Sequence, residues 1–229
     1  MATEEVSEGK ESEVDGPVSF RIPKVCYQSW REIPPQNAHI RDAMRLSRNR
    51  NPGIDFRVFT DTEMDSFVEK WGTERHVRAY RSIHPMHMAA RSDFFRYLAL
   101  WTHGGLWLDI KSILTRDVFA GGFIRPDDAC ILDAPNVIEP YRKHLGYPVR
   151  EQWFLASERS HPYFGMALER ICRDMLDPKS GYNEYFQESL SGPSKQVILR
   201  MTGPDCLAVA IHDAIIKHGV LHRTVRYHD

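Results

Sequence analysis

A stretch in the middle of the chain, residues 86–111, constrains the fold more than any other part of the sequence. Apolar residues recur there at the spacing of one helix face: Ala90, Phe94, Leu98 and Trp101. This spacing predicts a helix over residues 86–101. A break at residues 103–105, which includes two glycines, follows the helix, and residues 106–108 then predict a buried strand. Asp109 follows this strand directly, at the position where α/β sheets bind their ligands.

Further strands and helices alternate along the rest of the chain. Apolar runs and period-two alternation predict strands at residues 25–27, 54–59, 129–132 and 153–155. Helical spacing and capping residues predict helices at residues 36–50, 61–71, 161–176 and 204–218. Such alternation is typical of an α/β fold in which helices flank a mixed, mostly parallel sheet. No linker interrupts the pattern, so we expect residues 19–229 to form a single domain.

Charge is distributed unevenly between the N-terminus and the rest of the chain. Residues 1–16 hold six acidic side chains and one Lys, and residues 1–18 contain no aromatic residue. We therefore expect residues 1–18 to be a disordered acidic leader. Residues 17–229 keep 29 of the 30 basic and 25 of the 31 acidic side chains. This small basic excess forms no dense patch, so we expect no nucleic-acid partner.

The sequence shows neither a signal peptide nor a membrane-spanning segment. Its N-terminus is acidic and polar, and no window approaches the run of about 18 apolar residues that a span requires. Four cysteines lie far apart, without the spacing of a zinc site: Cys26, Cys130, Cys172 and Cys206. We therefore expect buried, reduced thiols and a cytoplasmic location.

Three charged residues of the central stretch are candidates for chemistry. Asp93 and Arg96 are close enough on the predicted helix to project from one face. They form either a local ion pair or part of a binding site. Asp109 follows the predicted strand, where its carboxylate either faces a ligand or caps a turn.

Four segments match the motifs of a known family in order. The first is IPKVCYQSW at residues 22–30, in which Tyr27 stands where His is usual, and the second begins with Asn51-Pro52 and ends with Thr60-Asp61. The most specific is the Ser-Asp-x-x-Arg-Tyr and Gly-Gly-Leu-Trp-Leu-Asp pattern within residues 90–109. The last, within residues 152–204, contains Gln-Trp-Phe, His-Pro and Thr-Gly-Pro. Over residues 21–210 the chain thus resembles glycosyltransferase family 32, whose members are DXD-motif sugar transferases.

The resemblance implies a GT-A type, Rossmann-like fold and a hexosyltransferase activity. Such an enzyme moves a sugar from a UDP- or GDP-sugar donor to a glycan or other hydroxyl acceptor, with retention of configuration. By the same resemblance, Trp30 would stack on the base, and Asp93 and Arg96 would hold ribose and sugar hydroxyls. Asp109 would be the first acid of the metal-binding motif, with Mn²⁺ or Mg²⁺ as the cofactor. Two further residues would also contact the donor: Gly105 and Gln152.

The chain departs from the family at the DXD motif, which reads Asp109-Ile110-Lys111. In one alternative Asp109 alone, with water and phosphate oxygens, still holds the divalent ion, because such ions need only one or two carboxylates. In a second, Lys111 neutralises the diphosphate and joins Asp109 and Arg96 in catalysis, unless it is simply a solvated loop residue. In a third, the protein is a non-catalytic relative that binds nucleotide sugars or glycans. We expect loops such as residues 134–150 to bind the acceptor.

Overall fold

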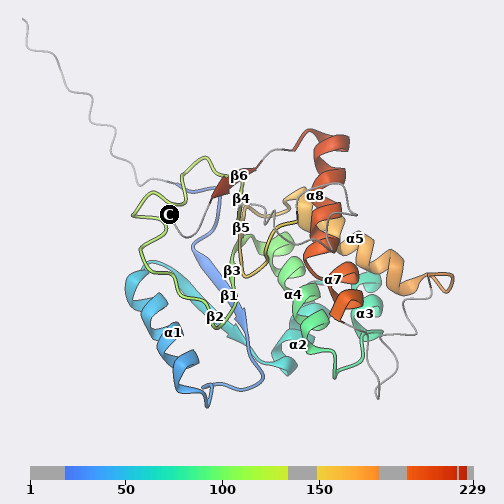
Figure 1. Cartoon of the computed structure of the whole chain (residues 1–229), viewed down its shortest axis with the longest axis horizontal. Helices are drawn as coiled ribbons and strands as arrows, with labels where there is room; N and C mark the ends of the chain where they lie inside the picture. Colours follow the sequence, from blue (N-terminus) through green and yellow to red (C-terminus); the bar gives the residue numbers. More distant parts are fainter. Residues whose placement is uncertain (1–18, 134–148, 181–194, 221, 226–229) are drawn as a thin grey trace, which may run out of the picture.

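The computed structural model describes residues 19–133, 149–180, 195–220 and 222–225. The predicted acidic leader at residues 1–18 lies outside the described residues, as does nearly all of the predicted acceptor loop at 134–150. The described part of the chain is built around one sheet, with helices on both of its faces (Figure 1).

Six strands form the sheet in the order β2-β1-β3-β5-β4-β6. Their bounds are β1 Val25–Ser29, β2 Asp55–Phe59, β3 Gly105–Leu108, β4 Cys130–Asp133, β5 Phe154–Ser157 and β6 Arg223–Val225. β1 pairs in parallel with both β2 and β3, and β4 pairs in parallel with β6. β5 runs antiparallel to its two neighbours, β3 and β4. The predicted mixed α/β sheet is therefore confirmed.

Helices are distributed unequally over the two faces of the sheet. α1 (Ala38–Arg50) covers one face, and the other helices lie on the opposite side (Figure 1). Their bounds are α2 Asp61–Trp71, α3 Glu74–Arg81, α4 Met88–His103, α5 Pro162–Leu176, α7 Lys195–Met201 and α8 Pro204–His218. α3, α7 and β6 were not predicted, and α4 begins and ends two residues later than expected.

Alternation along the strands produces two hydrophobic cores. Tyr27 of β1 and Trp107 of β3 belong to the larger core, which includes α4 and α5. The neighbouring Cys26 and Leu106 point to a smaller core on the opposite face. All four cysteines are buried and free, as predicted. Among the described residues, no helix has the length and apolarity that crossing a bilayer demands.

The turn between α4 and β3 needs glycine. Gly104 and Gly105 have φ values of 69° and 106°, in the left-handed region that L side chains avoid. A Cβ on Gly105 would lie 2.6 Å from the carbonyl oxygen of Val25, so a side chain would separate β3 from β1. Because the helix enters the strand without a longer loop, Asp93 and Arg96 on α4 are held near Asp109 at the carboxyl end of β3.

Candidate active site

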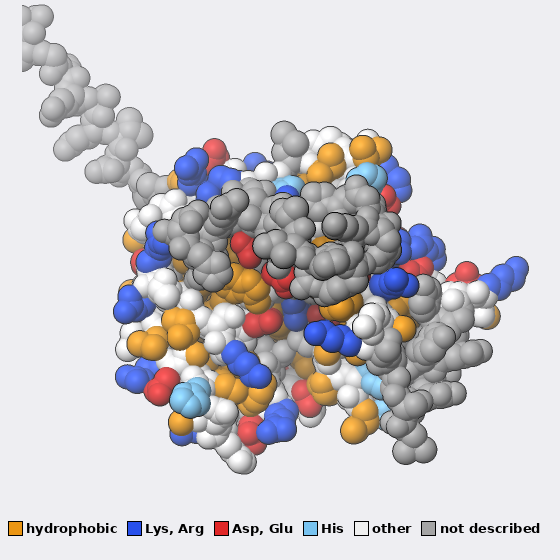
Figure 2. All heavy atoms as spheres, viewed as in Figure 1, with side chains coloured by type: hydrophobic (Ala, Val, Ile, Leu, Met, Phe, Trp, Pro, Cys, Tyr) orange, Lys and Arg blue, Asp and Glu red, His pale blue; other side chains and the backbone are white. Residues whose placement is uncertain are grey.

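A cavity of about 570 Å³ lies beyond the carboxyl ends of the three parallel strands β2, β1 and β3. It is lined by residues in or just after β1 and β3, by the first turn of α2 and by the N-terminal part of α4: Ser29, Trp30, Arg31, Asp61, Met64, Met88, Ala89, Ser92, Asp93, Arg96, Trp107, Asp109, Ile110, Lys111 and Ser112. Acidic and basic side chains lie close together near the middle of the face shown in Figure 2. Open α/β sheets bind their ligands at the carboxyl ends of the parallel strands, where this cavity lies.

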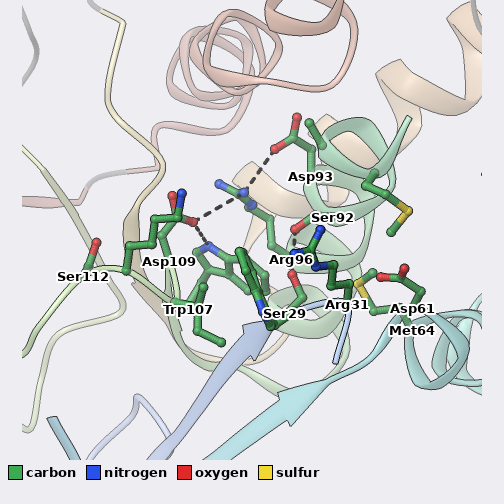
Figure 3. A pocket seen from close by; sticks show the side chains of 15 residues that line it. Ser29, Arg31, Asp61, Met64, Ser92, Asp93, Arg96, Trp107, Asp109 and Ser112 are labelled. Atoms are coloured by element: carbon green, nitrogen blue, oxygen red, sulfur yellow. Dashed lines mark hydrogen bonds and ion pairs between the residues drawn. The ribbon is translucent and has the colours of Figure 1, made fainter. Parts of the chain in front are cut away.

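Arg96 lies between Asp93 and Asp109 in the cavity (Figure 3). Its Nη1 donates to the main-chain carbonyl of Gln152 at 2.9 Å, and its Nη2 lies 3.2 Å from Asp93 Oδ1 and 3.6 Å from Asp109 Oδ1. The guanidinium carbon stands 4.7 Å from the centroid of the Trp107 ring. One planar cation therefore bridges two carboxylates and a main-chain carbonyl, a geometry that the fork of Arg allows and a Lys ammonium does not.

Asp93 is a buried carboxylate with a shifted pKa. Burial raises the pKa of Asp93 to about 6, against the opposing effects of Arg96 and of a hydrogen bond from Thr202, while Asp109 adds to the rise. Thr202 Oγ1 donates to Asp93 Oδ2 at 2.9 Å. The predicted ion pair between Asp93 and Arg96 is present, and both residues line the cavity. The sequence left open whether Asp93 and Arg96 form a local ion pair or part of a binding site. The two alternatives are compatible, because the pair is local and also lines the cavity.

Asp109 projects into the cavity from the end of β3. Its main-chain N–H donates to the carbonyl of Trp153 at 2.8 Å, and its carbonyl accepts from the N–H of Ser112 at 2.8 Å. Trp107 Nε1 donates to Asp109 Oδ1 at 2.8 Å. The side chain is 44% exposed, so the turn holds the carboxylate in place without burying it. We call Asp93, Arg96, Trp107 and Asp109 the inner wall.

Four other side chains that line the cavity, Trp30, Arg31, Asp61 and Lys111, form what we call the rim. Trp30 packs against Ile110 and residues of α1, and its buried Nε1 has no hydrogen-bond partner. Two cations stand near its ring: Arg31 at 5.8 Å and Lys111 at 5.9 Å from the centroid. The rim therefore presents an aromatic surface flanked by positive charge.

The cavity brings together five of the seven residues singled out in the sequence. Trp30, Asp93, Arg96, Asp109 and Lys111 all line it, and Gly105 and Gln152 do not. Gly105 instead permits the close approach of β3 to β1. The Gln152 amide is buried behind Arg96, with its Oε1 3.4 Å from Nη1 and its Nε2 bonded to the hydroxyl of Tyr97. These two residues support the cavity from behind.

Three features of the cavity were missed in the sequence. Trp107 was predicted as part of a buried strand, and its N–H also orients Asp109. The sequence signal for this contact is the spacing of two residues, which places both side chains on one face of a strand. Asp61 was noted at a helix start and at the end of the second motif, without a role in the site. A pair of hydroxyls, Ser29 Oγ and Ser92 Oγ at 3.0 Å, joins β1 to α4 in the cavity wall, and no sequence motif indicated it.

The cavity contains three carboxylates, those of Asp61, Asp93 and Asp109. Among the residues that the structure describes, no group of three or more His, Cys, Asp or Glu side chains is arranged to hold a metal ion. Two of the three carboxylates, Asp93 and Asp109, already share Arg96.

Comparisons with known proteins point to one class of enzyme. Residues 24–129 match the family model described as the glycosyltransferase sugar-binding region containing the DXD motif. The structure is similar to that of PaToxG glycosyltransferase, with a TM-score of 0.60 and 14% identity, covering 85% of this chain and 70% of that one. It is also similar to the ligand-free glycosyltransferase domain from the YGT toxin, with a TM-score of 0.58 and 10% identity, covering 90% and 80%. No curated protein sequence matches the chain. The fold is thus that of GT-A-like glycosyltransferase domains.

Proposed function

We propose that this protein is a retaining hexosyltransferase of glycosyltransferase family 32, with residues 19–229 as a single domain. It would move a sugar from a UDP- or GDP-sugar to a hydroxyl of a glycan or small acceptor. One observation carries the proposal: Trp30, Asp93, Arg96 and Asp109, which the motifs assign to donor binding, line one cavity at the carboxyl ends of the parallel strands. The match of residues 24–129 to the sugar-binding region supports it.

The inner wall and the rim suit different parts of such a donor. The ring of Trp30 lines the cavity and offers a flat face for the base. Asp93 and Asp109 offer carboxylate oxygens to ribose and sugar hydroxyls, and Arg96 keeps both acids in a fixed orientation. A rigid wall of this kind would hold the anomeric carbon in place. The sugar then loses its translational and rotational entropy on binding, and this loss no longer adds to the activation barrier.

The reaction needs positive charge near the diphosphate. The acceptor oxygen forms a bond to the anomeric carbon, and the bond from that carbon to the β-phosphate oxygen breaks with its electron pair remaining on the phosphate. The acceptor proton passes to the leaving diphosphate or to water. Cations placed before the reaction stabilise the charge that develops on the leaving oxygen. The cavity holds three of them: Arg31, Arg96 and Lys111.

A second candidate function is binding without turnover. The observation that favours it is Lys111 at the position of the second acid in the DXD motif. In that case the same cavity would take up a nucleotide sugar or a glycan and release it unchanged.

A donor panel tests the proposal. The purified chain is incubated with UDP-glucose, UDP-N-acetylglucosamine and GDP-mannose, each with Mg²⁺, with Mn²⁺ and with EDTA, and nucleoside diphosphate release is measured. We expect release from one donor, and a loss of about 100-fold in Asp109→Asn, in line with the removal of one preorganised polar group. Asp213→Asn, on α8 with a side chain 41% exposed, is the matched control.

The two candidate functions give different outcomes in the panel. Donor binding by calorimetry without nucleotide release identifies the binding-only relative, and no binding of any donor contradicts both functions. The configuration of the product at the anomeric carbon, read by NMR, tests retention.

A further inference from the structure

Lys111 is one of the three cations that line the cavity. It stands where the DXD motif has its second acid, directly after the buried Ile110, which packs against Trp30. The N–H of Ser112 donates to the carbonyl of Asp109, so a hydrogen-bonded turn fixes the main chain from which the Lys111 side chain extends. The side chain is exposed and lines the cavity.

The ammonium of Lys111 is not neutralised by the described part of the protein. No carboxylate of the described residues pairs with it, and its recorded partner is the ring of Trp30, 5.9 Å from Nζ. By contrast, Arg96 is bound by Asp93 and Asp109, and Arg31 has Glu32 at 3.9 Å. Lys111 thus has three N–H donors free for a ligand.

The donor set around Asp109 does not fit a divalent ion held by the protein. Oδ1 of Asp109 already accepts the N–H of Trp107 and faces the guanidinium of Arg96 at 3.6 Å, which leaves Oδ2. A second carboxylate would be expected at residue 111, and the side chain there is a cation that repels a metal ion. The acids that remain in the cavity are Asp93, which is paired with Arg96, and Asp61 on α2.

We propose that the Lys111 ammonium takes the place of the divalent ion and binds the diphosphate of the donor, so that transfer needs no metal. This inference rests on the proposed function. The diphosphate joins the base to the sugar, and Lys111 stands beside the aromatic ring assigned to the base and two residues from the acid assigned to the sugar. When the bond from the anomeric carbon to the β-phosphate oxygen breaks, the ammonium stabilises the new charge through hydrogen bonds and keeps its own protons.

Calorimetry with nucleoside diphosphates tests the assignment without relying on turnover. UDP and GDP are titrated into the purified, chelator-treated protein in EDTA, and the titration is repeated with Mn²⁺. We expect one of them to bind in EDTA, with a dissociation constant within about three-fold of that in Mn²⁺. Lys111→Met should weaken binding in EDTA at least ten-fold, and Lys111→Arg should recover most of that loss because it restores the charge.

The matched control is Lys70→Met. Lys70 is also exposed, and its Nζ stands 4.9 Å from the centroid of the Trp71 ring, but it lies on α2 outside the cavity. We expect this variant to bind the nucleotide as the unmodified chain does. If Lys70→Met weakened nucleotide binding as much as Lys111→Met does, the loss would be a general effect of surface charge, and the assignment to Lys111 would be overturned.

Lys111→Asp provides a gain-of-function test, because it restores the Asp-x-Asp spacing. We expect it to bind the nucleotide only with Mn²⁺, and to bind Mn²⁺ in the presence of nucleotide as seen by electron paramagnetic resonance. The unmodified chain should show no such Mn²⁺ signal.

The failure of this inference is distinguishable from the failure of the proposed function. If the unmodified chain binds or turns over its donor only with metal, the inference is wrong and the proposed function stands. If Lys111→Met keeps its affinity in EDTA, the assignment to Lys111 is wrong. If no nucleotide binds under any condition, both are wrong.

Discussion

The inner wall and the rim of the cavity differ in how their side chains are held. The charged groups of the inner wall hold one another: Arg96 contacts Asp93, Asp109, Trp107 and the carbonyl of Gln152. On the rim, Lys111 has only the ring of Trp30 among the described residues. The inner wall therefore has one fixed shape, and the rim can adapt to what it binds.

This difference assigns separate tasks to the two regions. A fixed wall selects by geometry, because a group that is displaced by a fraction of an ångström loses its partners. A flexible cation on the rim contributes mainly charge, whose effect changes slowly with distance. Exchanging Arg and Lys should therefore be severe on the inner wall and mild on the rim.

The largest expected effect comes from Arg96→Lys. A Lys ammonium cannot bridge two carboxylates and a carbonyl, so Asp93 and Asp109 would lose their common partner. We expect kcat/KM to fall about 1,000-fold, which corresponds to about 4 kcal/mol. Steady-state kinetics with the donor found in the panel measures this.

Lys111→Arg is the counterpart of that variant on the rim. It keeps the charge, and we expect a loss of less than about ten-fold, because a flexible rim does not require one shape. Losses of equal size in the two variants would contradict the distinction between the two regions. A melting transition recorded for each variant separates loss of activity from loss of the fold.

The second expected effect is a pH dependence of stability that comes from Asp93. Burial raises the pKa of Asp93 from 3.8 to about 6, so between these values the folded state binds more protons than the unfolded state. The free energy of unfolding therefore falls as the pH rises from about 4 to about 6, and the contribution of Asp93 is about 3 kcal/mol. Asp93→Asn removes this contribution. Denaturant unfolding at pH 4 and pH 6.5 measures it.

The control for Asp93 is Asp55→Asn at the start of β2, where the side chain is 57% exposed. Its unfolding free energy should follow the same pH dependence as that of the unmodified chain. If the unfolding free energy of Asp93→Asn shows the same pH dependence as that of the unmodified chain, the predicted contribution of Asp93 is wrong.

A smaller effect than that of Asp93→Asn is expected on the rim, from Trp30→Leu. The substitution removes the flat ring and the unpartnered indole N–H while it keeps an apolar contact with Ile110. Stacking on a base contributes about 1–3 kcal/mol, so we expect KM for the donor to rise about ten-fold with little change in kcat. Trp71→Leu, with Trp71 44% exposed outside the cavity, should leave KM unchanged. A change confined to kcat would contradict base stacking.

The elements that the sequence predicted well are those with strong local signals. The start of α2 is an example, because Thr60 and Glu63 form a reciprocal capping box there. α8 begins with Pro204 and ends at Gly219 in the left-handed conformation, as expected. α3 was missed because it is mostly charged and short, with His76 in place of the usual acid of its capping box. β6 is only three residues long and forms through its pairing with β4, which no local pattern reveals.

The site was predictable where it follows the chain and unpredictable where distant segments meet. Asp93, Arg96 and Asp109 could be placed together because one helix, one glycine turn and one strand connect them. The role of Gln152 behind Arg96 depends on β5 lying next to β3, and this pairing is antiparallel. Thr202 lies 109 residues from Asp93 in sequence, and its hydrogen bond follows only from tertiary packing.

The hydrogen bond from Thr202 to Asp93 has a consequence for recombination between relatives. The region that matches the family model ends at residue 129, so it carries the inner wall without Thr202 and without the carbonyl of Gln152. Any residue at position 152 supplies a main-chain carbonyl, whereas a hydroxyl at position 202 requires Ser, Thr or Tyr. In a chimaera with a crossover near residue 129, Arg96 therefore keeps its main-chain acceptor at position 152. Asp93 keeps its hydrogen bond only if the other parent also has a hydroxyl at position 202. A segment transferred between relatives with its inner wall intact must therefore extend from the central motif to position 202, in the last of the four motif segments.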